Sequence, residues 1–174
     1  SAKAGSASAK SAAKEFCIDV SEEEQICAHP SDLGALNAAH ANENALLNAS
    51  PNSRVGMIAT YRDAVVVGQA MEVELAEAVA AIADLEEPTR SAGDIEADSL
   101  AALEGGVASE DELTALEEEL AVAVTYETAQ TEIADLEAAL LEQYALETSL
   151  LELAANKPVD EAVEGAVKAM LGLE

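Results

Sequence analysis

Two cysteines, Cys17 and Cys27, are the residues of this chain whose type and spacing point most directly to chemistry. A structural zinc site needs about four ligands and commonly contains C-x-x-C, a pattern that the sequence lacks. In a single helix the two Cα atoms would lie roughly 15 Å apart, whereas a disulfide needs roughly 4.4–6.8 Å between them. Two cysteines this close in sequence favour an intramolecular bridge, provided that the chain folds back between them.

The residues between the cysteines offer a way to fold back. Ser21 and Glu24 have the spacing of a capping box and predict a short helix that starts at Glu22. The stretch CIDV at 17–20 would then lie outside that helix and could run back along it. We therefore predict that residues 15–30 form a hairpin closed by a Cys17–Cys27 disulfide.

The cysteine segment resembles two known families over about 13 of the 174 residues. Its C-x9-C spacing resembles half of the twin C-x9-C family of mitochondrial helical hairpins, which has two such pairs. The stretch EFCIDVSEEEQIC is similar to the C-terminal cysteine loop of the small chloroplast redox linker that clamps two Calvin-cycle enzymes. That loop has a proline and an acidic residue before its second cysteine, where this chain has Gln25 and Ile26. Neither resemblance identifies a family.

Other catalytic residue types are scarce. The chain has two histidines, His29 and His40, and no H-x-x-x-H, E-x-x-H, D-x-D-x-D-G or glycine-rich phosphate motif. Its carboxylates occur in runs such as EEE, which are typical of solvated helix surfaces. We expect no enzymatic activity, no cofactor, no metal site and no small-molecule substrate.

The charge is strongly unbalanced, with 35 acidic against 8 basic residues and a net charge of −27. Three of the bases, Lys3, Lys10 and Lys14, lie in an acid-free opening that predicts a flexible basic arm at 1–14. The acidic remainder repels phosphates and anionic lipids, which argues against nucleic-acid and membrane-surface binding. No apolar run approaches the roughly 20 residues of a membrane span.

The sequence as a whole predicts an all-α protein without a sheet, in which residues 31–174 form a helical bundle. Ala, Glu and Leu dominate it, and all three favour helices. Apolar stripes and end signals predict helices over 31–48, 53–87, about 95–104, about 110–156 and from Pro158 onward. Gly105 and Gly106 should end the third of these helices, and Ser109 and Glu112 have the spacing of a capping box that starts the fourth. The two long helices should pack antiparallel as an elongated hairpin, completed to a bundle by the short ones.

The C-terminal part of the longest helix is apolar around more than half of its circumference. We expect Leu140, Tyr144 and Leu151 in the intramolecular core. We expect Leu146, Leu150 and Leu153 to lie nearer a partner protein or a short helix, because one antiparallel neighbour cannot cover all of these leucines. The predicted candidate site is therefore a protein-binding surface.

These features predict a non-enzymatic scaffold or linker subunit of a larger protein assembly, which binds neighbours through helical faces and its N-terminal arm. A redox-controlled binding module gated by Cys17–Cys27 and an acidic, low-affinity cation-binding protein are the alternatives. The expected partners are other protein subunits. The Ser-, Ala- and Lys-rich opening favours an organelle, with the chloroplast first. A virion or the cytoplasm is the alternative location.

Overall fold

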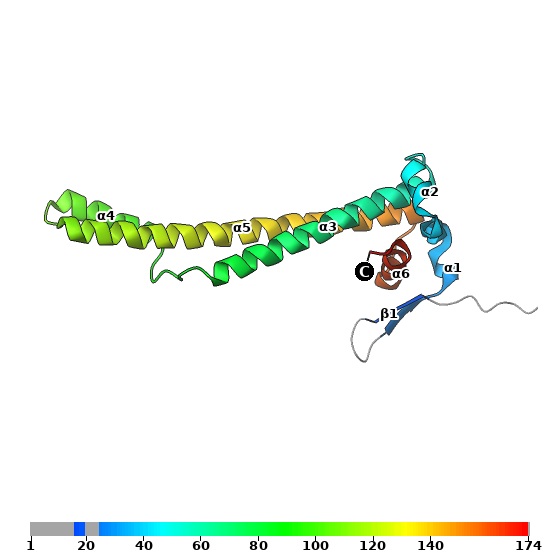
Figure 1. Cartoon of the computed structure of the whole chain (residues 1–174), viewed down its shortest axis with the longest axis horizontal. Coiled ribbons are helices and arrows are strands. Elements are labelled where there is room, and N and C mark those ends of the chain that lie inside the picture. Colours follow the sequence, from blue (N-terminus) through cyan, green and yellow to red (C-terminus); the bar gives the residue numbers. More distant parts are fainter. Residues whose placement is uncertain (1–15, 20–24, 174) are drawn as a thin grey trace, which may run out of the picture. The chain divides into compact units, whose positions relative to one another are not determined.

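The structure is a computed structural model that describes residues 16–19 and 25–173. The predicted arm at 1–14 and the capping box of Ser21 and Glu24 lie outside these residues. The described chain is helical apart from two short strands, β1 (Phe16–Asp19) and β2 (Gln25–Ala28), as Figure 1 shows. The helical elements are α1 (Pro30–Leu33), the 3₁₀ helix η1 (Gly34–His40), α2 (Glu43–Asn48), α3 (Arg54–Ala83), α4 (Ala92–Gly105), α5 (Glu110–Ala155) and α6 (Glu161–Leu171). The predicted all-α class is confirmed, although the two-stranded sheet of β1 and β2 was not expected.

The ends of α5 follow from local hydrogen bonds. The Ser109 N–H donates to Glu112 Oε2 at 2.8 Å, and the Glu112 N–H donates to Ser109 Oγ at 3.3 Å, which is the predicted capping box. At the other end Asn156 adopts a left-handed φ of 58°. The N–H groups of Asn156 and Lys157 bond to the carbonyls of Leu153 and Glu152, a Schellman-type ending.

The start of α3 depends on a glycine. The Gly56 N–H donates to Ser53 Oγ at 3.0 Å, and the preceding loop crosses directly over this turn. A Cβ at Gly56 would lie 2.0 Å from the carbonyl oxygen of Ser50. Only a residue without a side chain allows the backbone to approach this closely.

Two expectations about the N-terminal region are wrong. The single helix predicted for 31–48 is broken into α1, η1 and α2. Gly34 takes a positive φ of 50° after α1, and the Asn42 side chain caps a new helix by accepting from the Ala45 N–H at 2.9 Å. Residues 25–28 are a strand instead of a helix, because they pair with β1 as an antiparallel ladder.

The chain divides into two compact units. The discontinuous unit comprises Ser1–Val66 and Ala145–Glu174, and the central unit comprises Val67–Tyr144. The helices α3 and α5 each contribute a segment to both units.

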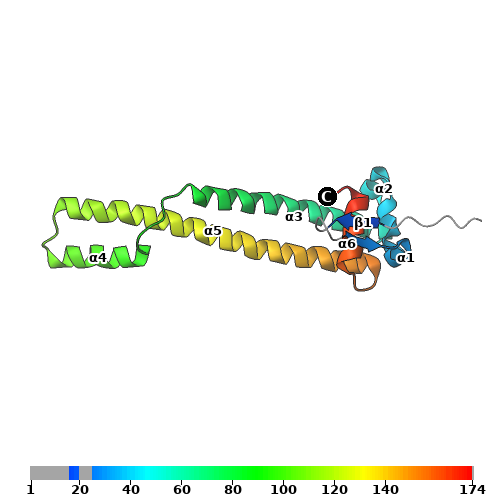
Figure 2. The same ribbon diagram turned by 90° about the horizontal axis from the view of Figure 1, so that it is seen from below.

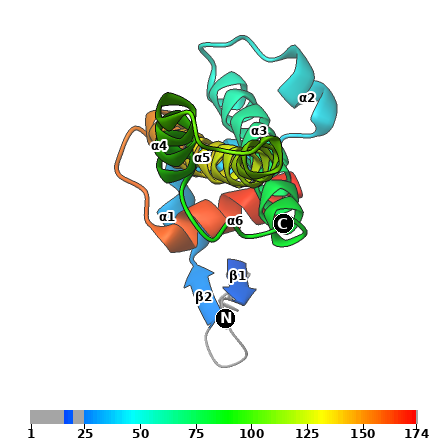
Figure 3. The same ribbon diagram turned by 90° about the vertical axis from the view of Figure 1, so that its left-hand side faces the viewer.

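The discontinuous unit has a continuous apolar core. Its helix α6 lies between the two strands and the unit's segments of α3 and α5 (Figures 1 and 3). Lys157 Nζ donates to the Asp32 carbonyl at 2.7 Å, and the Arg54 guanidinium donates to the Ala154 carbonyl, so polar contacts also join its two chain segments. The buried core residues are Leu33, Leu36, Ala39, Leu46, Ile58, Tyr61, Val65, Leu151, Ala154, Ala155, Val163, Ala166 and Val167.

The central unit has a much smaller core. Its helix α4 runs alongside the first part of α5, to which a short loop connects it (Figure 2). Ala92, Ile95 and Ala123 form the buried cluster, with Leu116 and Leu120 packed against it. The helix α4 also carries Leu100 and Leu103, which are 57% and 62% exposed.

Candidate protein-binding surfaces

The two strands place the cysteines opposite each other. Cys17 is the register partner of Cys27 in the antiparallel ladder. Directly opposite residues of such a pair have Cα atoms about 4.5–5.5 Å apart, which lies within the range of a disulfide. The chain therefore folds back as the predicted bridge requires, through a strand pair instead of a strand against a helix. The bond itself stays a prediction.

The predicted partner-binding leucines share one face of α5 in the discontinuous unit. Leu146, Leu150 and Leu153 are spaced by 4 and 3 residues, which places them in one row along the helix. Leu146 is 49% and Leu153 is 61% exposed, whereas Leu150 is half-buried and packs against the core. We call these three residues the leucine ridge. Its two outer members are accessible to another protein.

The predicted core positions on α5 are only partly correct. Leu140 and Leu151 are buried, as expected, at 8% and 1% exposure. Tyr144 is 39% exposed, and the expectation that it lies in the core is wrong. Its hydroxyl donates to Glu72 Oε1 at 2.6 Å, a contact at the solvent-facing side of the α3 and α5 segments of the central unit. A phenol can satisfy its hydroxyl at this position, which burial would make harder.

A buried acid, Glu147, was missed by the sequence analysis. It is 2% exposed, and Lys168 Nζ lies 3.8 Å from its Oε2 and 2.9 Å from Glu164 Oε1. The nearby Tyr61 hydroxyl is buried without a hydrogen-bond partner, and burial together with Glu164 and Glu147 raises the pKa of Tyr61 above its ordinary value. The spacing did contain a signal, because position 147 lies seven residues after the buried Leu140 and four before the buried Leu151, on the same face of the helix.

The central unit exposes more large apolar side chains than it buries. Ile95 and Leu140 are the large ones that are buried. The exposed set is Val67, Val73, Val79, Leu100, Leu103, Val107, Val124, Leu141 and Tyr144.

A groove of about 600 Å³ lies between α4 and α5 of the central unit, and we call it the α4–α5 groove. Asp98 and Ala102 line it from α4, and Glu112, Ala115, Leu116 and Glu119 line it from α5. Val107, in the connecting loop, stands at its rim with 89% exposure. The floor is apolar, and carboxylates flank it.

Two carboxylates of the groove, Glu112 and Glu119, have lowered pKa values. Glu119 accepts from Arg90 Nη2 at 2.9 Å and from Arg90 Nε at 3.0 Å, and this interaction lowers the pKa of Glu119. Arg90 also bonds to Asp98, and both partners raise the pKa of its guanidinium. The N–H and hydroxyl of Ser109 lower the pKa of Glu112. A basic ligand would therefore meet charged acceptors here.

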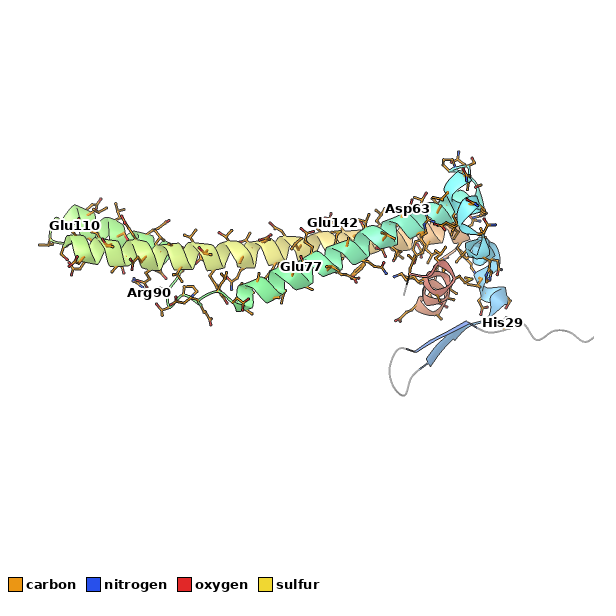
Figure 4. The ribbon with its side chains drawn as sticks, viewed as in Figure 1. His29, Asp63, Glu77, Arg90, Glu110 and Glu142 are labelled. Carbon is orange, nitrogen blue, oxygen red and sulfur yellow. The ribbon has the colours of Figure 1, made fainter. Side chains whose placement is uncertain are left out.

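Arg90 is the one basic residue among 67–144, against 21 acidic residues. Figure 4 shows it just before α4, and it is already bonded to Asp98 and Glu119. Acids such as Glu77, Glu110 and Glu142 are exposed along the helices of the same unit (Figure 4). The unit thus presents a nearly unopposed negative surface.

Metal sites and membrane spans are two other features to consider in the described residues. Within 16–19 and 25–173, no group of three or more His, Cys, Asp or Glu side chains is placed to hold a metal ion. None of the helices in the described part of the chain has the length and apolarity to cross a membrane. Comparison of the chain with protein families, curated proteins and solved structures finds no match.

Proposed function

We propose that this protein is a non-enzymatic scaffold or linker subunit of a larger protein assembly. The observation that carries the proposal is the excess of exposed over buried large apolar side chains in the central unit. A helical segment with so small a core gains little stability from its own packing, and covering its apolar side chains with a partner would supply more.

The leucine ridge supports the proposal from the discontinuous unit. That unit has a full core of its own, yet Leu146 and Leu153 remain about half exposed or more. A row of leucines on a well-packed helix is a pre-organised surface, because binding does not have to order the backbone. We therefore assign Leu146, Leu150 and Leu153 to a protein contact.

The partners are proteins with basic surfaces. The net charge of −27 makes contact with another acidic surface unfavourable and contact with a cationic one favourable at moderate salt. An organellar complex, with the chloroplast first, remains our preferred setting, on the composition of the N-terminal arm alone.

The test begins with the native protein, crosslinked gently and isolated from its source, and its bound chains identified by mass spectrometry. The identified chains are then purified and titrated with the full-length protein. Leu153→Asp should weaken binding by about tenfold or more, since burying an unpaired carboxylate in a contact is costly. Leu47→Asp is the matched control, because Leu47 is 64% exposed on α2, outside the ridge.

Two results would count against the scaffold proposal. One is a native protein that carries no other chain after crosslinking. The other is a central unit whose amides are strongly protected from hydrogen exchange in the isolated chain, since the unit would then need no partner.

A redox-controlled binding module is the second candidate, and a separate observation favours it. Cys17 faces Cys27 across the strand pair, and α6 contacts both strands. Opening a disulfide at this position would loosen the hairpin where it meets a core helix. Titrating the identified partner with and without dithiothreitol tests this candidate, and equal affinity in both conditions would refute it.

A further inference from the structure

The α4–α5 groove combines the shape and the charge that a helical ligand needs. We infer that it is a docking site for a basic amphipathic helix of another protein. The inference rests on the proposed function, and it specifies the chemistry of one partner.

The shape argument starts from the spacing of the lining residues. Asp98 and Ala102 are one helical turn apart on α4, and Glu112, Ala115 and Glu119 repeat at about one turn on α5. The two helices therefore present parallel rows with a furrow between them, into which the side chains of a third helix can pack. The alanines of the floor are small and allow close approach of the third helix.

The apolar floor of the α4–α5 groove determines which side chains the ligand needs. Ala102, Ala115 and Leu116 supply the floor, and Val107 at the rim is almost fully exposed. A matching helix would place leucine-like side chains at i, i+3, i+4 and i+7 along the floor.

Charge decides between the possible occupants. Asp98, Glu112 and Glu119 flank the furrow, and Arg90 offsets only part of their charge. The unit as a whole has 21 acids and one base. A second copy of this chain, at −27, would be repelled, as would an acidic peptide. A helix with lysines or arginines beside its apolar row has complementary charge and could pair with the flanking carboxylates.

The test uses the full-length chain and a fluorescent peptide of about 14 residues, four turns of helix. The peptide contains only leucine and lysine, with the leucines at i, i+3, i+4 and i+7. A peptide of the same composition in scrambled order is the first control. We expect the patterned peptide to bind about tenfold more tightly than the scrambled one, measured by fluorescence anisotropy at physiological salt.

A pair of matched variants locates the binding site. Ala115 and Ala121 are both exposed alanines of α5, but only Ala115 lines the groove. Ala115→Arg and Ala121→Arg change the net charge equally, and arginine is a good helix former. Ala115→Arg should weaken binding of the patterned peptide about tenfold, and Ala121→Arg less than about twofold.

Three outcomes would overturn the inference. Equal binding of the two peptides would indicate attraction by charge alone, and equal weakening by the two variants would place the site elsewhere. A self-association of the chain that Ala115→Arg abolishes would assign the groove to a second copy. None of these outcomes affects the leucine ridge, so the scaffold proposal is tested separately by Leu153→Asp.

Discussion

The discontinuous unit and the central unit draw on the same two long helices but bury very different amounts of apolar surface. The discontinuous unit surrounds its segments of α3 and α5 with η1, α2 and α6, and its core cluster has 13 buried residues, including Tyr61. The cluster of the central unit has three, two of which are alanines. At roughly 25 cal/mol per Å² of buried apolar surface, packing stabilises the first unit far more than the second.

In the central unit, helix caps and intrinsic helix propensity take the place of core packing. Its helices begin at strong caps, with Ser91 accepting from the Asp94 N–H and Ser109 from the Glu112 N–H. Alanine, leucine and glutamate give high intrinsic helix propensity. Caps and propensity can maintain a helix without specifying a unique tertiary contact, so this unit can form its helices and still lack a covering partner.

The largest expected effect is on the core of the discontinuous unit. Leu151→Ala removes a side chain that is 1% exposed and should lower the free energy of unfolding by about 2–5 kcal/mol. Leu141→Ala, at 69% exposure in the central unit, should change it by less than about 0.5 kcal/mol. Urea denaturation followed by circular dichroism measures both. Equal losses would mean that the two units do not differ in packing as described.

The second effect concerns the cysteine hairpin. A disulfide that closes the loop from Cys17 to Cys27 should contribute about 2–3 kcal/mol in the chain-entropy model. Reduction should therefore raise hydrogen exchange in the strands and α6, and leave the central unit unchanged, because the hairpin contacts α6. Non-reducing mass spectrometry first establishes the bond, and two free thiols or a disulfide-linked dimer would contradict it.

A glycine pair gives a smaller contrast between the units. Gly56→Ala forces a Cβ against the Ser50 carbonyl and should cost about 1–3 kcal/mol by overpacking. Gly93→Ala, in the first turn of α4, has no atom within 4 Å of the new Cβ and should be neutral or stabilise by up to about 1 kcal/mol. Thermal melts of the two variants provide the comparison, and a similar melting temperature for both would refute the close approach at Gly56.

The smallest expected effect is electrostatic and depends on pH. The folded-state pKa of Glu119 is lowered by Arg90, so its carboxylate stabilises the fold above the ordinary glutamate pKa of about 4.3. This contribution is lost as the pH falls through the lowered pKa. Glu119→Gln should therefore melt at a lower temperature than the unmodified protein at pH 7, and the difference should shrink as the pH falls below about 4.

Glu118→Gln is the control, because it removes the same charge from an exposed neighbour on α5. It should shift the melting temperature less than Glu119→Gln at pH 7. A pH-independent difference between the two variants would argue against the ion pair as the cause.

The sequence predicted those features that depend on near neighbours in the chain. The capping box of Ser109 and Glu112 and the helix end at Gly106, which has a φ of 63°, are local in this sense. The burial of Leu140 and Leu151 followed from helical periodicity. The chain reversal between Cys17 and Cys27 was also predicted, although residues 25–28 form a strand instead of the expected helix.

The features that the sequence did not predict depend on distant contacts. Tyr144 lies outside the core because Glu72 offers its hydroxyl a partner at the surface. Glu147 is buried although its side chain is acidic, and Lys168 of α6 places its Nζ 3.8 Å from the Glu147 carboxylate. The α4–α5 groove exists because one particular side of α4 packs against α5. Apolar residues of α4 occupy both buried and exposed positions, so the apolar pattern did not predict which side of α4 would face α5.

The core of the discontinuous unit is built from two segments that lie far apart in the sequence. This separation affects the order in which the two units fold during synthesis. The α4–α5 hairpin needs only residues that follow one another closely, and local contacts of this kind form early. The core of the discontinuous unit joins Leu33, Ile58 and Val167, so it is incomplete until Val167 has been made. At about 5–20 residues per second, the first 66 residues wait several seconds for α6. During that interval their apolar side chains are exposed to chaperones and to neighbouring chains.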